Sequence, residues 1–288
     1  MAAGEPILYS LYVYAPNKGA PIFFAVAYAL SAGFHIWQCY RYKAFKLIGL
    51  HPICAVNFAV GYALREYGAY NYLYQDTTKL PLILFVISQV LIYIGPPLLE
   101  LANYHVLGRM FYFVPHYSPL PPNRVLITFG GLMGVVELLN SLGIALASNT
   151  SSSRQQQTLG GQLIVAATGI QVGIIVIFFC LTGIFHRRCA RVKVLAKRVN
   201  TVLVVLYASM SLIFVRCIYR LVEHTEPTKV DISDLEALRK LSPLRRYEVY
   251  FHVFEAAFML VNSGRMGRRS EQKRSTMTGH YGQRVPMY

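Results

Sequence analysis

Charged side chains recur at helical spacing in two apolar stretches near the C-terminal end of the sequence. Two sets share i, i+4, i+7 spacing, Arg216, Arg220 and Glu223 in one stretch and Glu248, His252 and Glu255 in the next. Residues at this spacing lie on one face of a helix. A mostly cationic face and a mostly acidic face on consecutive helices predict ion pairs. We expect Arg216 to pair with Glu255, and Arg220 with Glu248 or Glu223.

Two further charged residues lie inside apolar stretches. Glu137 stands one turn from Asn140 in the fourth stretch, and Arg65 stands in the second. At 1.5 Å per residue, Glu137 lies roughly 15 Å and Glu255 roughly 12 Å below the same end of a helical bundle. Arg65 and Arg216 lie nearer to that end, so we expect Arg65 to meet Glu137 or one of the other acids.

An ionisable side chain at bilayer depth costs about 2.5–3.5 kcal/mol, and such residues usually face the interior of a bundle and pair. Two interpretations follow. The pairs can simply fix the register of the helices. Alternatively, they line a polar cavity that handles the headgroup of an amphiphile or a coupling proton, with Glu137 and Glu255 as the proton-carrying candidates. His35, Gln89 and Gln171 can add hydrogen bonds.

Seven apolar stretches must position these residues: 20–40, 49–67, 80–103, 125–147, 161–185, 200–221 and 247–264. Each is long enough to cross a hydrocarbon core of about 30 Å as a helix. The sequence therefore predicts an all-α polytopic membrane protein with seven transmembrane helices. Residues 1–264 form the membrane domain, and residues 265–288 form a basic, flexible tail.

The basic residues predict the orientation. If the N-terminus lies outside, 17 of the 28 Lys and Arg residues fall in inner segments and eight in outer segments. This excess places the C-terminus in the cytoplasm. The single N-x-S/T sequon, at Asn149, then lies outside, where it can be glycosylated. Residues 1–19 lack a basic start, so we expect the first helix to act as its own insertion signal.

Proline and capping patterns predict three local features. Pro96 and Pro97 should kink or break the third helix near Gly95. Four prolines in the loop 104–124 predict an extended turn. The loop 222–246 contains a capping box, from Ser233 to Glu236, that predicts a short surface helix.

Several function classes are disfavoured. The net charge of +15 follows membrane topology and does not indicate nucleic-acid binding. No GxxxxGK[ST] loop is present, so the chain does not hydrolyse ATP by that route. The five cysteines form no CxxC pair, and His35 and His252, which lie within the predicted helices, are too few ligands for a zinc hydrolase. We expect no enzyme activity, no cofactor and no metal.

Motifs along most of the helical region carry a family resemblance. They are Gly61-Tyr62-Ala-Leu-Arg65, Pro97 with Asn103-Tyr104 and Leu107-Gly108-Arg109, Phe129 with Glu137 and Gly143, Gly160-Gly161 with Gln171, Arg216-Cys-Ile-Tyr219-Arg220-Leu-Val-Glu223, Tyr247-Glu248 and Phe254-Glu255. In order and spacing the chain resembles the fungal lipid-translocating exporters, the RTA-like seven-helix proteins. It departs from the family at Phe58 and Met133, where many members carry acids, and lacks the His-Pro after the last helix.

The resemblance implies a plasma-membrane exporter or translocase. Its substrates would be amphiphilic lipids such as sphingoid long-chain bases, or toxic hydrophobic compounds, and its partners membrane lipids. The resemblance does not fix the oligomeric state. The alternative is a seven-helix sensor or receptor for a lipid or small molecule. Against a receptor, the third helix ends Leu107-Gly-Arg-Met without an acidic-Arg-aromatic switch, and the last ends Val261-Asn-Ser-Gly without an Asn-Pro-x-x-Tyr turn.

Overall fold

The fold is a bundle of long helices. The computed structural model describes residues 7–8, 10–12, 14–43, 45, 49–70, 73, 80–113, 115–148, 153–190, 196–225, 236, 238, 241 and 243–264. The long helices are α1 (Ala20–Tyr42), α3 (Leu50–Tyr70), α4 (Leu80–Phe113), α5 (Pro122–Ser148), α6 (Arg154–Ala190) and α7 (Ala196–Thr225). The short helices α9 (Pro243–Arg246) and α10 (Glu248–Phe251) precede a π-helix, η2 (His252–Ala257), after which the chain is α-helical to residue 264.

All seven predicted stretches are helical, so the all-α prediction is confirmed. Among the described residues, five helices are long and apolar enough to cross a membrane: Ala20–Arg41, Leu80–Tyr112, Arg124–Ala147, Gln155–Ala190 and Val199–Thr225. The two other stretches are more polar or less regular. His51, Asn57 and Arg65 lower the hydropathy of α3, and the π-helix interrupts the last helical segment.

The predicted extended turn over 104–124 is wrong in part. Helix α4 continues to Phe113, a 3-10 helix, η1 (Pro115–Tyr117), follows, and α5 begins at Pro122. The first proline of the loop stands at Pro115, so nothing before it stops the helix. Pro122 lies at the start of α5, where a missing backbone N–H costs nothing.

Of the predicted kink or break at Pro96 and Pro97, the break is not present, because α4 runs through both residues without interruption. Membrane helices tolerate proline where neighbouring helices supply other hydrogen bonds. Helix α3 contacts α4 beside the prolines, where Cys54 Sγ donates to the Gly95 carbonyl at 3.2 Å.

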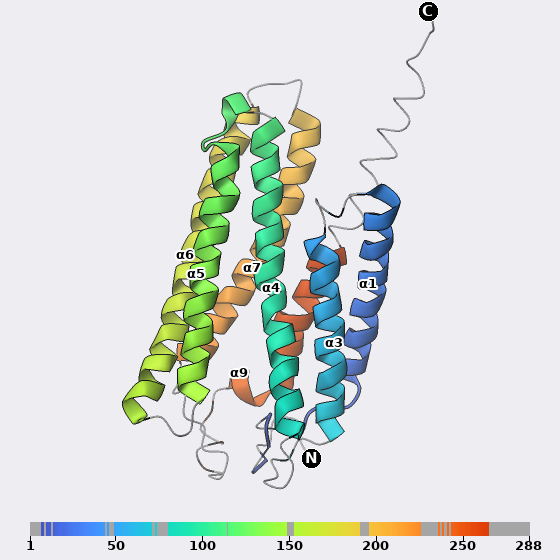
Figure 1. Ribbon diagram of the computed structural model, residues 1–288, viewed down its shortest axis with the longest axis vertical. Helices are drawn as coiled ribbons and strands as arrows, with labels where there is room; N and C mark the ends of the chain where they lie inside the picture. Colours follow the sequence, from blue (N-terminus) through green and yellow to red (C-terminus); the bar gives the residue numbers. More distant parts are fainter. Residues whose placement is uncertain are drawn as a thin grey trace, which may run out of the picture.

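Helix α4 lies at the centre of the bundle, with α5 and α6 on one side and α3 and α1 on the other (Figure 1). Helix α7 and the last helical segment lie behind it in the same view. Helices α5 and α6 approach closely at two glycines: a Cβ on Gly160 would lie 2.7 Å from the Gly143 carbonyl oxygen. Small residues commonly allow such contact between membrane helices.

Aromatic side chains fill the interior toward the Phe113 end of α4. The Tyr104 ring stacks on Phe129 of α5 with centroids 4.8 Å apart, and it also contacts Phe178 of α6 at 5.5 Å. Farther along, Phe111 packs on Phe185 at 4.8 Å. All five rings are buried. We call these residues, Tyr104, Phe111, Phe129, Phe178 and Phe185, the aromatic cluster; it fills the interior between Glu100 and the Phe113 end of α4.

Three predictions fall outside the described residues. They are glycosylation at Asn149, the surface helix that begins at Ser233, and the tail 265–288.

Candidate functional site

The predicted pair Arg216–Glu255 is present and buried. Arg216 Nε on α7 donates to Glu255 Oε2 on η2 at 2.7 Å, and the two side chains are 6% and 0% exposed. Arg220, one turn along α7, places its Nε 3.6 Å from Glu255 Oε1. A single carboxylate therefore faces two guanidinium groups, one of them at hydrogen-bond distance.

Arg220 also joins the second predicted pair. Its Nη1 donates to Glu223 Oε2 at 2.9 Å, so of the two acids expected for Arg220 the structure selects Glu223. The guanidinium lies over the Tyr93 ring of α4, 4.1 Å from the centroid. This cation–π contact joins α7 to α4.

Arg65 of α3 pairs with Glu248, at 3.1 Å between Nη2 and Oε1. The same Nη2 donates to the Tyr14 hydroxyl at 3.0 Å, and the guanidinium lies 4.1 Å from the centroid of Phe251. Glu248 Oε2 also accepts a hydrogen bond from the backbone N–H of Asn17 at 2.7 Å. The segment before α1 is thereby joined to α3 and to the last helical segment.

Tyr14 lies outside the membrane-spanning helices, and its burial raises its pKa to about 12. It therefore remains a neutral phenol at physiological pH and accepts the Arg65 hydrogen bond without contributing charge. We call Arg65, Arg216, Arg220, Glu223, Glu248 and Glu255 the ion-pair network.

The π-helix η2 divides the acidic face that the sequence predicts. Glu248 pairs with Arg65 of α3, whereas Glu255 pairs with α7. His252 Nε2 lies 3.2 Å from Glu248 Oε1, and its ring stacks on Phe24 at 5.4 Å. Spacing of i, i+4, i+7 assumes a regular α-helix, so it did not anticipate this division. π-helical turns frequently mark functional sites.

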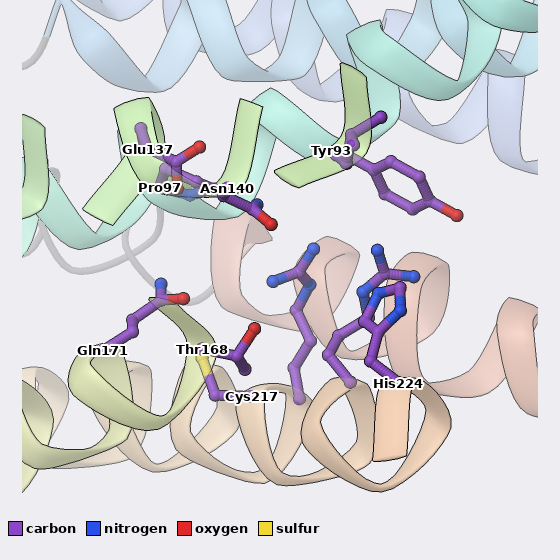
Figure 2. Close-up of a pocket in the computed structure, with 11 residues that line it drawn as sticks. Tyr93, Pro97, Glu137, Asn140, Thr168, Gln171, Cys217 and His224 are labelled. Atoms are coloured by element: carbon purple, nitrogen blue, oxygen red, sulfur yellow. The ribbon is translucent and has the colours of Figure 1, made fainter. Parts of the chain in front are cut away.

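A small polar cavity borders the network. Its volume is about 30 Å³, room for one or two water molecules. Residues of α4, α5, α6 and α7 line it: Tyr93, Pro97, Glu137, Asn140, Ile144, Thr168, Gln171, Arg216, Cys217, Arg220 and His224. Figure 2 shows Glu137 and Asn140 on one wall, opposite Gln171 and Thr168. We call this space the polar cavity.

The polar cavity brings Glu137 and Asn140 together with Arg216 and Arg220, as predicted. Glu137 forms no ion pair among the residues that the structure describes, so the expected alternative of Arg65 with Glu137 is not realised.

Sequence reasoning missed Glu100 of α4. This carboxyl group is fully buried. Gln171 Nε2 donates to its Oε2 at 2.7 Å, and the Tyr104 hydroxyl bonds to its Oε1. The signal was available, because Glu100 is an acid inside the predicted span 80–103. It has no charged neighbour at helical spacing, so a pattern of paired charges does not include it.

His35 forms a separate polar contact. Its Nε2 lies 3.0 Å from the Ser263 hydroxyl, which also bonds to Ser31 at 2.9 Å. These bonds join α1 to the end of the last helical segment. Within the described part of the chain, no three His, Cys, Asp or Glu side chains gather closely enough to hold a metal ion.

This architecture and order of motifs agree with a known family: the model of the RTA1-like proteins matches residues 53–266. The chain belongs to the RTA1-like family. The match covers every residue of the ion-pair network and of the polar cavity. With its apolar helices, membership makes the chain a multi-pass membrane protein.

Three curated relatives are similar over much of the chain. The lipid-translocating exporter-like protein RTA1 of Leptosphaeria maculans is 56% identical over 261 residues, covering 90% of this chain and 50% of its own length. The probable lipid transporter atnI of Emericella nidulans is 24% identical, covering 86% and 64%. A lipid-translocating exporter-like protein RTA1 of Ajellomyces capsulatus is 26% identical, covering 62% and 55%.

The chain thus spans between half and 64% of the length of these relatives. No solved structure matches it.

Proposed function

We propose that the protein moves amphiphilic lipids or toxic hydrophobic compounds across a membrane, with sphingoid long-chain bases as the first substrate to test. The observation that carries the proposal is the ion-pair network beside a polar cavity, inside a bundle whose outer surface is apolar. Similar proteins named as lipid transporters support the substrate class. We place the protein in the plasma membrane, with the N-terminus outside.

The polar cavity, at about 30 Å³, is too small for a lipid headgroup, so the structure corresponds to a closed conformation under this proposal. Admission of a headgroup requires α7 or the last helical segment to move away from α4. The contacts that resist such a move are Arg216–Glu255 and the stacking of Arg220 on Tyr93. A cationic headgroup entering here would meet Glu137, an acid without an ion-pair partner among the described residues.

The sequence contains no phosphate-binding loop for ATP, so we propose movement down a gradient or movement coupled to protons.

Efflux of a fluorescent sphingoid base from cells that lack their own exporter tests the proposal. Wild type should lower retained fluorescence relative to empty cells. Glu137→Gln should reduce the rate severalfold at equal surface expression, because it removes the uncompensated acid without breaking an ion pair. Glu255→Gln should reduce efflux further.

Asn140→Gln, a change in the same cavity wall that leaves every charge in place, is the matched control and should retain most of the efflux. Wild-type protein that reaches the surface and gives no efflux of several amphiphiles would overturn the proposal. A calcium or second-messenger response to the same compounds would then favour a receptor.

A further inference from the structure

Two carboxyl groups of the described residues are fully buried, Glu100 and Glu255, and they differ in whether cations lie beside them. Glu255 faces Arg216 and Arg220. No Lys, Arg or His nitrogen of the described residues forms an ion pair with Glu100. Burial of a carboxylate without a cation costs several kcal/mol, and uptake of a proton removes that cost.

The surroundings of Glu100 suit a carboxyl group that exchanges a proton. Its two hydrogen-bond partners, Tyr104 and Gln171, are both neutral. With Glu100 protonated, the carbonyl oxygen Oε2 still accepts from Gln171, and the proton on Oε1 is shared with the Tyr104 hydroxyl. When Glu100 is ionised, both partners donate. The same two side chains therefore satisfy either form.

A route for the proton exists on the side of the polar cavity. Gln171 bonds to Glu100 and also lines the polar cavity, and Pro97, one turn before Glu100 on α4, lines it as well. On the other side lies the aromatic cluster that begins with Tyr104, whose packed rings are apolar. Gln171 donates its N–H to Glu100 and cannot itself accept the proton, so a proton leaving Glu100 would pass to water that enters beside Gln171 from the polar cavity.

Charged and titratable groups on the packed helices are few. Glu137 of α5 and Arg216 and Cys217 of α7 interact with Glu100 electrostatically, and α6 presents the neutral Gln171. Glu137 disfavours ionisation of Glu100, and Arg216 favours it. Since Arg216 is held by Glu255, release of Arg216 from that pair would strengthen its attraction for an ionised Glu100.

We propose that Glu100, held by Tyr104 and Gln171, is the proton-binding site of this protein, that it exchanges its proton with the polar cavity, and that Glu255 serves instead as the ion-pair partner of Arg216. In the transport cycle, a movement that opens the pair Arg216–Glu255 would draw Arg216 toward Glu100 and release the proton. The coupling step depends on the transport function proposed above. The proton-binding site does not depend on it.

Infrared difference spectra of the purified protein, recorded as pH is raised, test the site without transport. A protonated carboxyl group gives a carbonyl stretching band that disappears on ionisation. Wild type should show such a band, Glu100→Gln should lack it, and Tyr104→Phe should shift its frequency because one hydrogen bond is lost. Glu255→Gln should retain the band, because Glu100 is still present, but the band should disappear at a lower pH, because Arg216 has lost its counter-ion. An identical titrating band in wild type and in Glu100→Gln would overturn the proposal.

If Glu100→Gln does not fold, Glu100→Asp serves in its place. The shorter acid no longer reaches both partners, so the band should move. An unmoved band would overturn the proposal. Size-exclusion chromatography of each variant checks folding.

Transport at two pH values tests the coupling. Efflux by wild type should change severalfold between them, and efflux by Glu100→Gln should not. Equal pH dependence in both would overturn the coupling step while leaving the spectroscopic result intact. Absence of any efflux in wild type would contradict the transport function, and the spectra would still decide whether Glu100 binds a proton.

Discussion

Glu255 and Glu100 are equally buried and differ only in what surrounds them. Two arginines of α7 approach Glu255, and two neutral side chains hold Glu100. The comparison teaches that depth alone does not assign a role to a membrane carboxylate. A carboxylate between two cations is fixed as an anion and stabilises the packing of two helices, whereas one held by neutral groups can gain or lose a proton.

The largest expected effect is on Glu255. Glu255→Gln leaves Arg216 buried without its counter-ion, which should lower the free energy of unfolding by about 3–5 kcal/mol. Thermal melting of the purified protein in detergent measures the loss. A melting temperature equal to that of wild type would remove the structural role of the pair.

The exchange Glu255→Arg with Arg216→Glu sharpens this result. Restored stability would identify the pair itself as the stabilising element. Because Arg220 also approaches Glu255, the arginine introduced at position 255 would meet a second cation, and we expect recovery of only part of the loss. Recovered folding with absent efflux would assign the carboxylate a direct part in transport.

The next largest loss of stability is expected on substitution of Arg65. Arg65→Met removes the hydrogen bonds to Glu248 and Tyr14 but leaves Glu248 its bond to the Asn17 backbone, so we expect a loss of about 2 kcal/mol. Limited proteolysis should also cleave the segment before α1 more rapidly, because Tyr14 loses its partner. Unchanged cleavage would show that this segment is held by other contacts.

Glu100→Gln should change stability by less than about 1 kcal/mol, since the amide reproduces the hydrogen bonds of a protonated carboxyl group. Melting under the conditions used for Glu255→Gln compares the two buried acids directly. A loss as large as that of Glu255→Gln would mean that Glu100 is ionised in the folded protein and that the two sites are alike.

Glu223→Gln should have the smallest effect, about 0.5 kcal/mol, because the pair with Arg220 joins neighbouring turns of one helix and is partly exposed. It is the control for removal of an acid from the ion-pair network. A larger loss would mean that Glu223 holds Arg220 in place over Tyr93.

Much of this fold followed from the sequence, because length and hydropathy in a bilayer leave a helix as almost the only choice. The pairs Arg216–Glu255 and Arg220–Glu223 followed from spacing on regular helices. The π-helix did not, since no local pattern in 252–257 distinguishes it from an α-helix. The break expected at Pro96 and Pro97 is absent for a related reason. Contacts with the neighbouring helix α3, which the local sequence does not show, decide whether prolines interrupt a helix.

Glu100 was not predicted as a site residue for a different reason. Its partner Gln171 lies 71 residues away in sequence, and neutral partners leave no charge pattern to detect.

Reconstitution of the purified chain into lipid vesicles tests the central claim most directly. A fluorescent sphingoid base is placed in both leaflets, and a membrane-impermeant quencher is added outside. If the chain translocates amphiphiles, vesicles that contain it should lose nearly all fluorescence, and those with Glu255→Gln much less of it. Loss of only the outer-leaflet signal, as in protein-free vesicles, would contradict the account.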